Sequence, residues 1–163
     1  MKTSPESLKK LLNELQNDKN CPYEFDYLSE KNPNAFEWKT VLEGTQDTIY
    51  EGGYYMLKIK FTENYPSERP NVYFLNKIFH PHVDSSNGWA CIEPPSNDII
   101  DIMKTVENMF IEYDKNIGHA FNNEATRTYN SDKDENKNNF KNEVRNWVRA
   151  FAKLEDIDKY YDL

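Results

Sequence analysis

Hydrophobic and polar positions near the N-terminus repeat with the period of a helix. Four leucines fall at i, i+3, i+4 and i+7, the spacing of one helical face: Leu8, Leu11, Leu12 and Leu15. Ser4 and Pro5 stand where an N-cap residue and a first-turn proline are favoured. The pattern predicts a short amphipathic helix whose polar face carries Lys9 and Lys10.

Three later segments alternate hydrophobic and polar residues, as half-buried strands do. They read FEWKTVLEG, YYMLKIKF and NVYFL, at residues 36–44, 54–61 and 71–75. Short turns separate them, and YPSERP supplies one such turn with two prolines. The sequence therefore predicts an antiparallel meander sheet of about four strands after the first helix.

Beyond residue 98 the period becomes helical again. A central buried helix, capped by Ser96 or Asp98, is predicted from Ile99, Ile102, Met103, Val106, Phe110 and Tyr113. A shorter helical segment at about 121–130 and a charged loop precede another stripe, formed by Phe140, Val144, Trp147, Val148 and Phe151. Strands grouped between helices indicate the α+β class. We expect a core at 1–152 and a short helix or tail at 153–163.

Composition restricts the partners of the chain. Its 163 residues fit one domain, and aromatic residues, at 14%, supplement a hydrophobic content of 37%. A formal net charge of −8 argues against binding to nucleic acid or to anionic membranes. The sequence shows no membrane-spanning run and no secretory signal, so we expect a location in the cytoplasm or also in the nucleus.

Cysteine usage raises the question of chemistry. Cys21 and Cys91 are the two cysteines, which suggests neither a disulfide framework nor a zinc site, and we expect no metal and no cofactor. Cys91 could be a nucleophile, a metal ligand or a small core residue. It follows the polar, turn-forming run DSSNG and precedes Pro94 and Pro95. Such segments stay at the surface, which favours an accessible thiol.

Four segments, in order and at nearly the right spacing, resemble the catalytic core of the ubiquitin-conjugating enzyme family. They are YEGGYYMLKIKF, YPSERPNVYF, IFHPHV and NGWACI, and they cover most of the chain. The resemblance implies the fold of that family and an acyltransferase that works through a thioester. It implies ubiquitin or a ubiquitin-like modifier, an activating enzyme and a RING-type or other ligase as partners.

The resemblance also assigns roles to residues. Cys91 stands at the thioester position, and His82 replaces the asparagine of a His-Pro-Asn motif, whose side chain binds the oxyanion or holds a nearby loop. His82 either fills that role or is a solvated loop residue in a protein that reacts weakly with lysine. His80 and Pro81 are interpreted as holding the turn. His119 falls in a loop that often presents an acidic residue or a serine near the attacking lysine, and it is either catalytic or a loop residue without a role.

Further departures from the family pattern concern partner binding. The position of Ser67 often carries a large hydrophobic residue that contacts ligases. The segment between Cys91 and the central helix is about four residues shorter than is common and lacks a frequent tryptophan. Lys9 and Lys10 match a surface that docks the activating enzyme, although exposed lysines also serve solubility.

Two other functions remain open from the sequence. An inactive family variant would bind ubiquitin or a partner without covalent chemistry; the presence of Cys91 opposes this, while the replaced asparagine favours it. A Cys-His hydrolase would use Cys91 with His82 or His119. It would need a third orienting residue and a helix that starts at the cysteine, and the sequence indicates neither.

Overall fold

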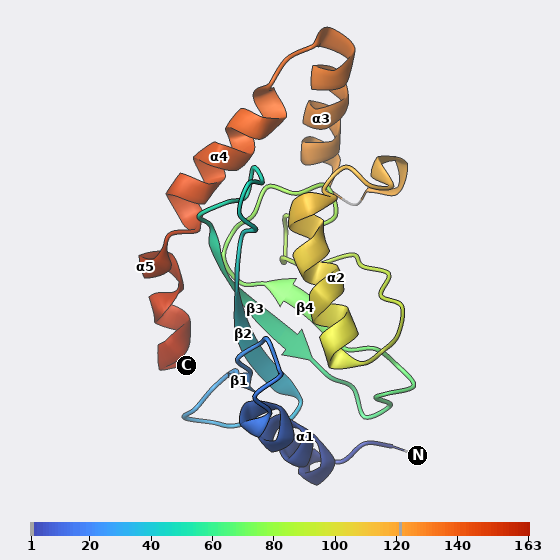
Figure 1. Ribbon diagram of the computed structural model, residues 1–163, viewed down its shortest axis with the longest axis vertical. Helices are drawn as coiled ribbons and strands as arrows, with labels where there is room; N and C mark the ends of the chain where they lie inside the picture. The colour runs from blue at the N-terminus through green and yellow to red at the C-terminus, as the bar shows by residue number, and fades with distance from the viewer. Residues whose placement is uncertain (1, 121) are drawn as a thin grey trace.

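A computed structural model of the chain describes residues 2–120 and 122–163 (Figure 1). Its first helix, α1 (Pro5–Asn17), begins after Ser4, whose side chain accepts a hydrogen bond from the backbone N–H of Ser7. Leu8 and Leu12 are buried on the face that the spacing predicts. The predicted N-terminal helix, its cap and its buried side are therefore confirmed.

A four-stranded antiparallel sheet follows, in the order β1-β2-β3-β4. The strands are β1 (Asp26–Tyr27), β2 (Glu37–Glu43), β3 (Tyr54–Lys60) and β4 (Asn71–Phe74). The last three coincide with the predicted segments, so the meander is confirmed. β1 has only 2 residues, which is too short for alternation to reveal it.

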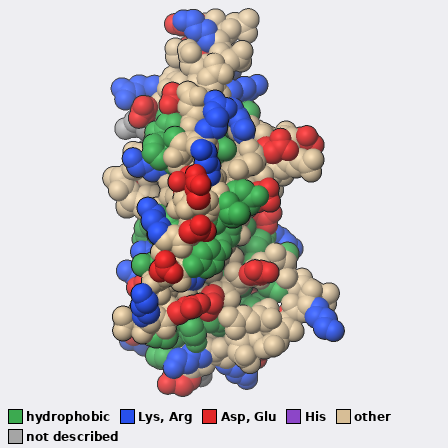
Figure 2. Space-filling view, turned by 90° about the vertical axis from the view of Figure 1, so that its left-hand side faces the viewer, with side chains coloured by type: hydrophobic (Ala, Val, Ile, Leu, Met, Phe, Trp, Pro, Cys, Tyr) green, Lys and Arg blue, Asp and Glu red, His purple; other side chains and the backbone are tan. Residues whose placement is uncertain are grey.

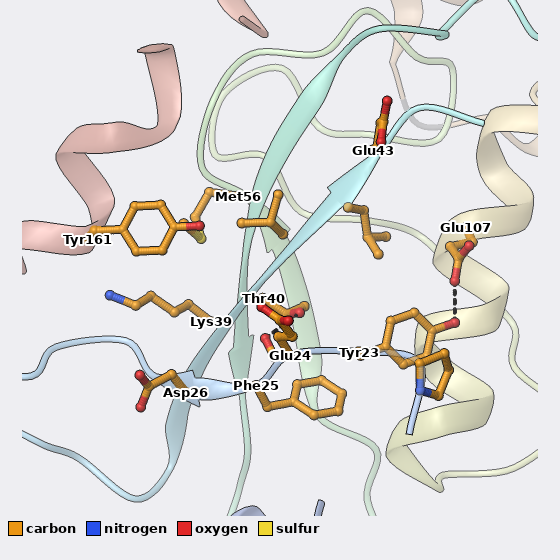
Figure 3. Close-up of a pocket in the computed structure, with 13 residues that line it drawn as sticks. Tyr23, Glu24, Phe25, Asp26, Lys39, Thr40, Glu43, Met56, Glu107 and Tyr161 are labelled. Carbon is orange, nitrogen blue, oxygen red and sulfur yellow. Dashed lines mark hydrogen bonds between the residues drawn. The ribbon is translucent and has the colours of Figure 1, made fainter. Parts of the chain in front are cut away.

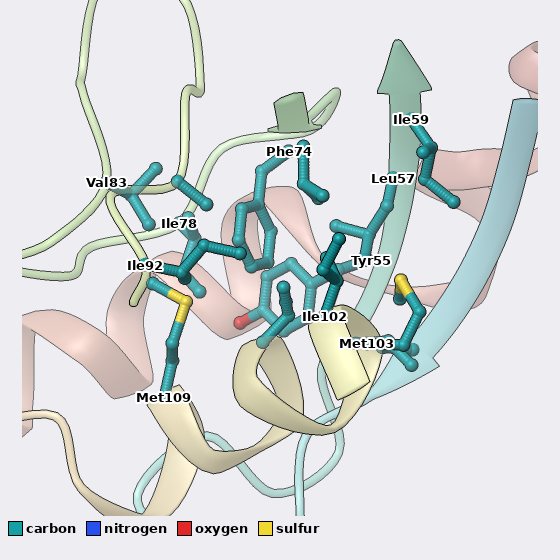
Figure 4. Packing of buried hydrophobic residues seen from close by; sticks show 14 of the residues in the cluster. Tyr55, Leu57, Ile59, Phe74, Ile78, Val83, Ile92, Ile102, Met103 and Met109 are labelled. Atoms are coloured by element: carbon teal, nitrogen blue, oxygen red, sulfur yellow. The ribbon is translucent and has the colours of Figure 1, made fainter. Parts of the chain in front are cut away.

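The central helix α2 (Ile99–Ile111) packs on one face of the sheet, called here the inner face (Figures 1 and 4). The side chain of Asp98 accepts a hydrogen bond from the N–H of Ile100 and caps the helix. Phe110 is fully buried against Tyr55 and Phe74 from the strands, with ring centroids 5.5 and 6.5 Å away. Each such burial contributes about 1.5–3 kcal/mol to folding. Together these contacts make one core and confirm the α+β class.

Two helices follow at one end of the sheet, α3 (Asn123–Glu135) and α4 (Asn139–Phe151). The predicted stripe of α4 is confirmed, with Phe140, Val144 and Val148 buried. The predicted end near residue 130 is wrong, because α3 runs on to Glu135 and only residues 136–138 of the expected charged loop remain before α4. The predicted start, residue 121, lies outside the described residues. Hydrophobic residues are scarce in α3, so periodicity alone does not reveal its length.

The last residues form α5 (Leu154–Ile157) and a short 3-10 helix, η2 (Asp158–Asp162). This segment lies across the sheet from α2, on the outer face (Figure 1). Ile157 is fully buried, and Tyr160 ties the segment to the sheet because its hydroxyl donates to Leu75 O at 2.8 Å. Of the two expectations for residues 153–163, the structure has the packed short helix and not the tail.

Charged side chains of both signs cover the side on which α5 lies (Figure 2). Carboxylates alternate there with small hydrophobic patches, and no histidine is visible on this face. None of the helices in the described part of the chain is long and apolar enough to cross a membrane.

Candidate active site

The segment between β4 and α2 attaches to the sheet through backbone hydrogen bonds. Ala90 N donates to Val72 O at 2.9 Å, and Phe74 N donates to Gly88 O at 2.8 Å. Gly88 has φ +79°, and a Cβ atom there would lie 2.0 Å from Phe74 O. Only glycine fits this position, so the NG turn before Cys91 holds the cysteine segment against β4.

Cys91 lies between two anchored neighbours. Ala90 and Ile92 are buried in the core, with 2% and 7% of their surface exposed, while Cys91 is half-buried and free. In an extended chain, neighbouring side chains point in opposite directions, so Cys91 is presented outward. Its backbone N–H donates to His82 O at 2.9 Å. The reading of Cys91 as an ordinary core residue therefore does not fit.

His80 fastens the turn that precedes the cysteine. Its Nε2 donates to Met109 O at 2.7 Å, because a carbonyl can only accept, and its Nδ1 accepts from His82 N at 3.0 Å. Burial of the ring lowers the pKa of His80 to about 3. The neutral ring thus has both nitrogens bound within the protein and leaves no free nitrogen for chemistry.

His82 is half-buried beside Cys91 in the backbone, and its ring reaches the loop after α2. The distance from Nε2 to Lys115 O is 2.6 Å, and the carbonyl acceptor assigns the proton to Nε2. Of the two roles that the motif residue could have, this geometry matches the holding of a nearby loop. In this conformation the Nε2 proton is donated to Lys115 O and not to a substrate.

Asn122 joins the same region, and the sequence reasoning missed it. Its backbone N–H donates to Pro81 O at 2.7 Å, and its Nδ2 donates to Val83 O at 3.1 Å. Its Oδ1 accepts from Ala125 N and caps α3. An asparagine before a helix is a cap signal, but its contact with the His-Pro-His segment comes from the fold.

The other predicted residues lie apart from this hydrogen-bonded group. His119 is exposed in the 3-10 turn η1 (Ile117–His119), where its backbone N–H donates to Asn116 O. Lys9 and Lys10 are exposed on α1, with Lys10 Nζ 4.0 Å from a carboxylate oxygen of Glu14. The structure brings Cys91, His80, Pro81 and His82 together and leaves Lys9, Lys10 and His119 outside this hydrogen-bonded group, and the roles of all seven residues stay predictions.

Two observations bear on the hypotheses that Cys91 is a metal ligand or the nucleophile of a hydrolase. Within residues 2–120 and 122–163, no group of three or more His, Cys, Asp or Glu side chains is arranged to hold a metal ion. No helix begins at Cys91, since α2 begins at Ile99. A Cys-His hydrolase that activates its cysteine at a helix N-terminus is therefore not what this geometry supports.

Comparison with known proteins gives matches along most of the chain. The family model described as "Ubiquitin-conjugating enzyme" matches residues 7–148. The ubiquitin-conjugating enzyme E2-23 kDa of Triticum aestivum is 31% identical over 132 residues, which are 77% of this chain and 69% of that protein. Ubiquitin-conjugating enzyme E2 6 of Arabidopsis thaliana is 31% identical over 120 residues, 70% of this chain and 63% of the relative.

Proposed function

The chain belongs to the ubiquitin-conjugating enzyme family, and from this premise we propose that Cys91 carries ubiquitin or a ubiquitin-like modifier as a thioester. The observation that carries the proposal is the position of Cys91, a free, half-buried cysteine between two buried neighbours and beside the His-Pro-His turn. The matched relatives carry the name of this enzyme class.

The proposed reaction has two acyl transfers. The Cys91 thiolate attacks the thioester carbonyl between the modifier and a cysteine of the activating enzyme; a new C–S bond forms, and that cysteine leaves as a thiolate and takes a proton. A neutral lysine amine of a substrate then attacks the Cys91 thioester. An amide forms, the amine loses a proton, and Cys91 is released.

The residues around Cys91 would position this chemistry. His80 accepts from the backbone N–H of His82, and Asn122 donates to the carbonyls of the residues on either side of it. The His82 ring donates to Lys115 O in the loop after α2. A lysine approaching the thioester would meet groups held by these bonds. Alignment of reacting groups contributes several kcal/mol to catalysis in general. His119 and the docking lysines Lys9 and Lys10 keep their proposed roles toward the substrate lysine and the activating enzyme.

The test of the proposed function is a charging assay. The chain is incubated with ubiquitin, its activating enzyme and ATP, and the products are separated on a gel without reductant. We expect a band of added modifier mass that a thiol reductant removes. No such band with ubiquitin or with any ubiquitin-like modifier, each supplied with its own activating enzyme, would overturn the proposal.

The alternative is a non-covalent binding module for ubiquitin or for a partner. The bond between His82 Nε2 and Lys115 O favours it, since that donor is not directed to a substrate in this conformation. This alternative predicts no charging together with measurable ubiquitin binding by calorimetry. The charging assay therefore separates the two functions.

A prediction for His82 follows from its contact with Lys115. We expect His82→Ala to charge normally but to discharge to free lysine about tenfold more slowly, because the loop loses its tie to the active-site turn. The measurement compares discharge rates at equal concentrations of charged wild type, His82→Ala and His82→Asn, and we expect asparagine, which can still donate a hydrogen bond, to restore part of the rate. Discharge by His82→Ala as fast as by the wild type would contradict a part for this residue.

A second prediction concerns ligases. Ser67 is exposed where relatives often place a hydrophobic anchor, and Asn97 Nδ2 ties this loop to the segment after Cys91 through Pro66 O at 2.8 Å and Ser67 O at 3.2 Å. Loss of a central anchor often costs about 2 kcal/mol or more of binding. We expect generic RING domains to stimulate discharge weakly. Strong stimulation by several unrelated RING domains would contradict this.

A further inference from the structure

A cavity of about 610 Å³ lies at the edge of the sheet formed by β1 and β2 (Figure 3). Its walls are the segment 22–26, residues 39–43 of β2, Met56 of β3, Glu107 of α2 and Tyr161 of η2. Because the strand order is β1-β2-β3-β4 and the Cys91 segment pairs with β4, the cavity lies at the opposite edge of the sheet from Cys91. The proposed acyl transfer does not use it.

Among the residues that the structure describes, no backbone hydrogen bond reaches the β1-facing side of β2 at Val41 and Glu43. The backbone N–H and C=O groups of Glu37 and Lys39 point toward β1, and Glu37 O accepts a hydrogen bond from Leu28 N. The backbone of Gly44 points the other way, and its N–H donates to Gly53 O. Hydrogen-bonding direction alternates along a strand, so the N–H and C=O groups of Val41 and Glu43 also point toward the β1 edge. β1 stops at Asp26 and does not reach them.

A side chain explains why the pairing stops. The Thr40 hydroxyl donates to Glu24 O at 2.9 Å, so the segment before β1 is bound by a side chain and not by the next backbone pair. The stretch of β2 beyond Lys39 therefore stays unpaired on its β1 side because of how the segment before β1 is bound. An unpaired strand edge is a template for another strand.

The lining of the cavity is acidic. It holds the carboxylates of Glu24, Asp26, Glu43 and Glu107 against a single ammonium, that of Lys39. Lys39 already has partners, since its Nζ donates to Tyr160 O at 2.9 Å and lies 5.3 Å from the centroid of the Tyr161 ring.

Two of these carboxylates are free to meet a cation. Glu107 accepts a hydrogen bond from the Tyr23 hydroxyl, and Asp26 accepts from Tyr27 N. Glu24 and Glu43 are exposed and have no ion pair among the residues that the structure describes. A lysine or arginine side chain of a partner at this edge would therefore pair with Glu24 or Glu43 without displacing a cation of the described protein.

We propose that the open edge of β2 at Val41–Glu43 binds an extended, basic segment of a partner protein by β-strand addition. Backbone hydrogen bonds to Val41 and Glu43 would give the affinity, and lysine or arginine side chains beside Glu24 and Glu43 would give the specificity. A second copy of the chain does not fit as the occupant, because pairing two such edges would bring like charges together.

The test uses a fluorescent seven-residue peptide of alternating lysine and valine with threonine at each end, and an N-methylated version that keeps the charge but cannot pair as a strand. We expect the first peptide to shift the amide resonances of Val41 and Glu43 and of residues 23–26. We expect the N-methylated version to bind at least about tenfold more weakly.

Matched variants test the two sources of binding. Val41→Pro removes an edge N–H at a position where proline is tolerated, and the double change Glu24→Lys with Glu43→Lys reverses the charge. Each should weaken binding by about tenfold or more, while Glu51→Lys, exposed outside the cavity, should not. Circular dichroism checks that every variant is folded.

Two outcomes would overturn the proposal. Equal binding of the two peptides would exclude strand addition. Amide shifts dispersed over the surface, with equal loss of binding in Glu51→Lys, would show only attraction to an acidic protein. Both readouts are independent of charging at Cys91, so failure of the proposed function would leave this test unchanged.

Discussion

The Cys91→Ala variant will form no thioester with the modifier, while Cys21→Ser will charge like the wild type. The change removes the sulfur that the proposed transfer requires, and because Cys91 is half-buried at the surface, its loss should not unfold the protein. Charging should fall below detection on a gel run without reductant. Circular dichroism of both variants verifies the fold.

A serine at position 91 separates nucleophile chemistry from simple binding. Cys91→Ser should form an ester adduct that resists thiol reductants, since an oxygen ester does not exchange with thiols. Cys21 is the matched control, because it is also a free, half-buried cysteine, and its Sγ is bound to Tyr23 O at 3.3 Å. Normal charging of Cys91→Ala would show that the thioester forms elsewhere.

The second large effect is a loss of stability in acid that depends on His80. Burial lowers the pKa of His80 to about 3, whereas an unfolded histidine titrates near 6.5. Between these values the unfolded chain binds more protons than the folded one, so stability falls as the pH falls through this window. From pH 7 to pH 4.5 this residue alone should reduce the free energy of unfolding by about 2.5 kcal/mol.

The measurement is urea unfolding at both pH values for the wild type and for His80→Gln. Glutamine can still donate to Met109 O and accept from His82 N, yet it does not titrate. The variant should lose about 2.5 kcal/mol less than the wild type over this range. His119→Gln, which removes an exposed histidine, should behave like the wild type. Identical pH dependence in all three proteins would contradict the burial of a neutral His80.

Much of the fold follows from local patterns. The capped helices α1 and α2 and the three long strands have the periodicity and flanking residues that their positions require, so the sequence predicts them. β1 is missed because two residues carry no period. The C-terminal helix packs by contacts such as Tyr160 with Leu75 O, which join residues 85 apart in sequence.

The candidate site also has a part that the sequence predicts and a part that depends on the fold. Cys91 and His80 lie in motifs with a recognisable composition, and the turn residue Gly88 is readable because positive φ favours glycine. The bonds of His82 to Lys115 O and of Asn122 to Val83 O join the chain before α2 to the chain after it. Such contacts depend on how α2 lies on the sheet, which no local pattern specifies. The open edge of β2 depends equally on where β1 ends.

The most direct test of the central claim is to locate the modifier on the charged enzyme by peptide mapping. Charged protein is digested with trypsin at acidic pH without reductant, and the modifier remnant is sought by mass spectrometry. The two cysteines fall in different tryptic peptides, residues 20–31 for Cys21 and 78–104 for Cys91. We predict the remnant on peptide 78–104, lost on treatment with a thiol. A remnant on peptide 20–31, or on a lysine alone with no thiol-sensitive form, would contradict the account.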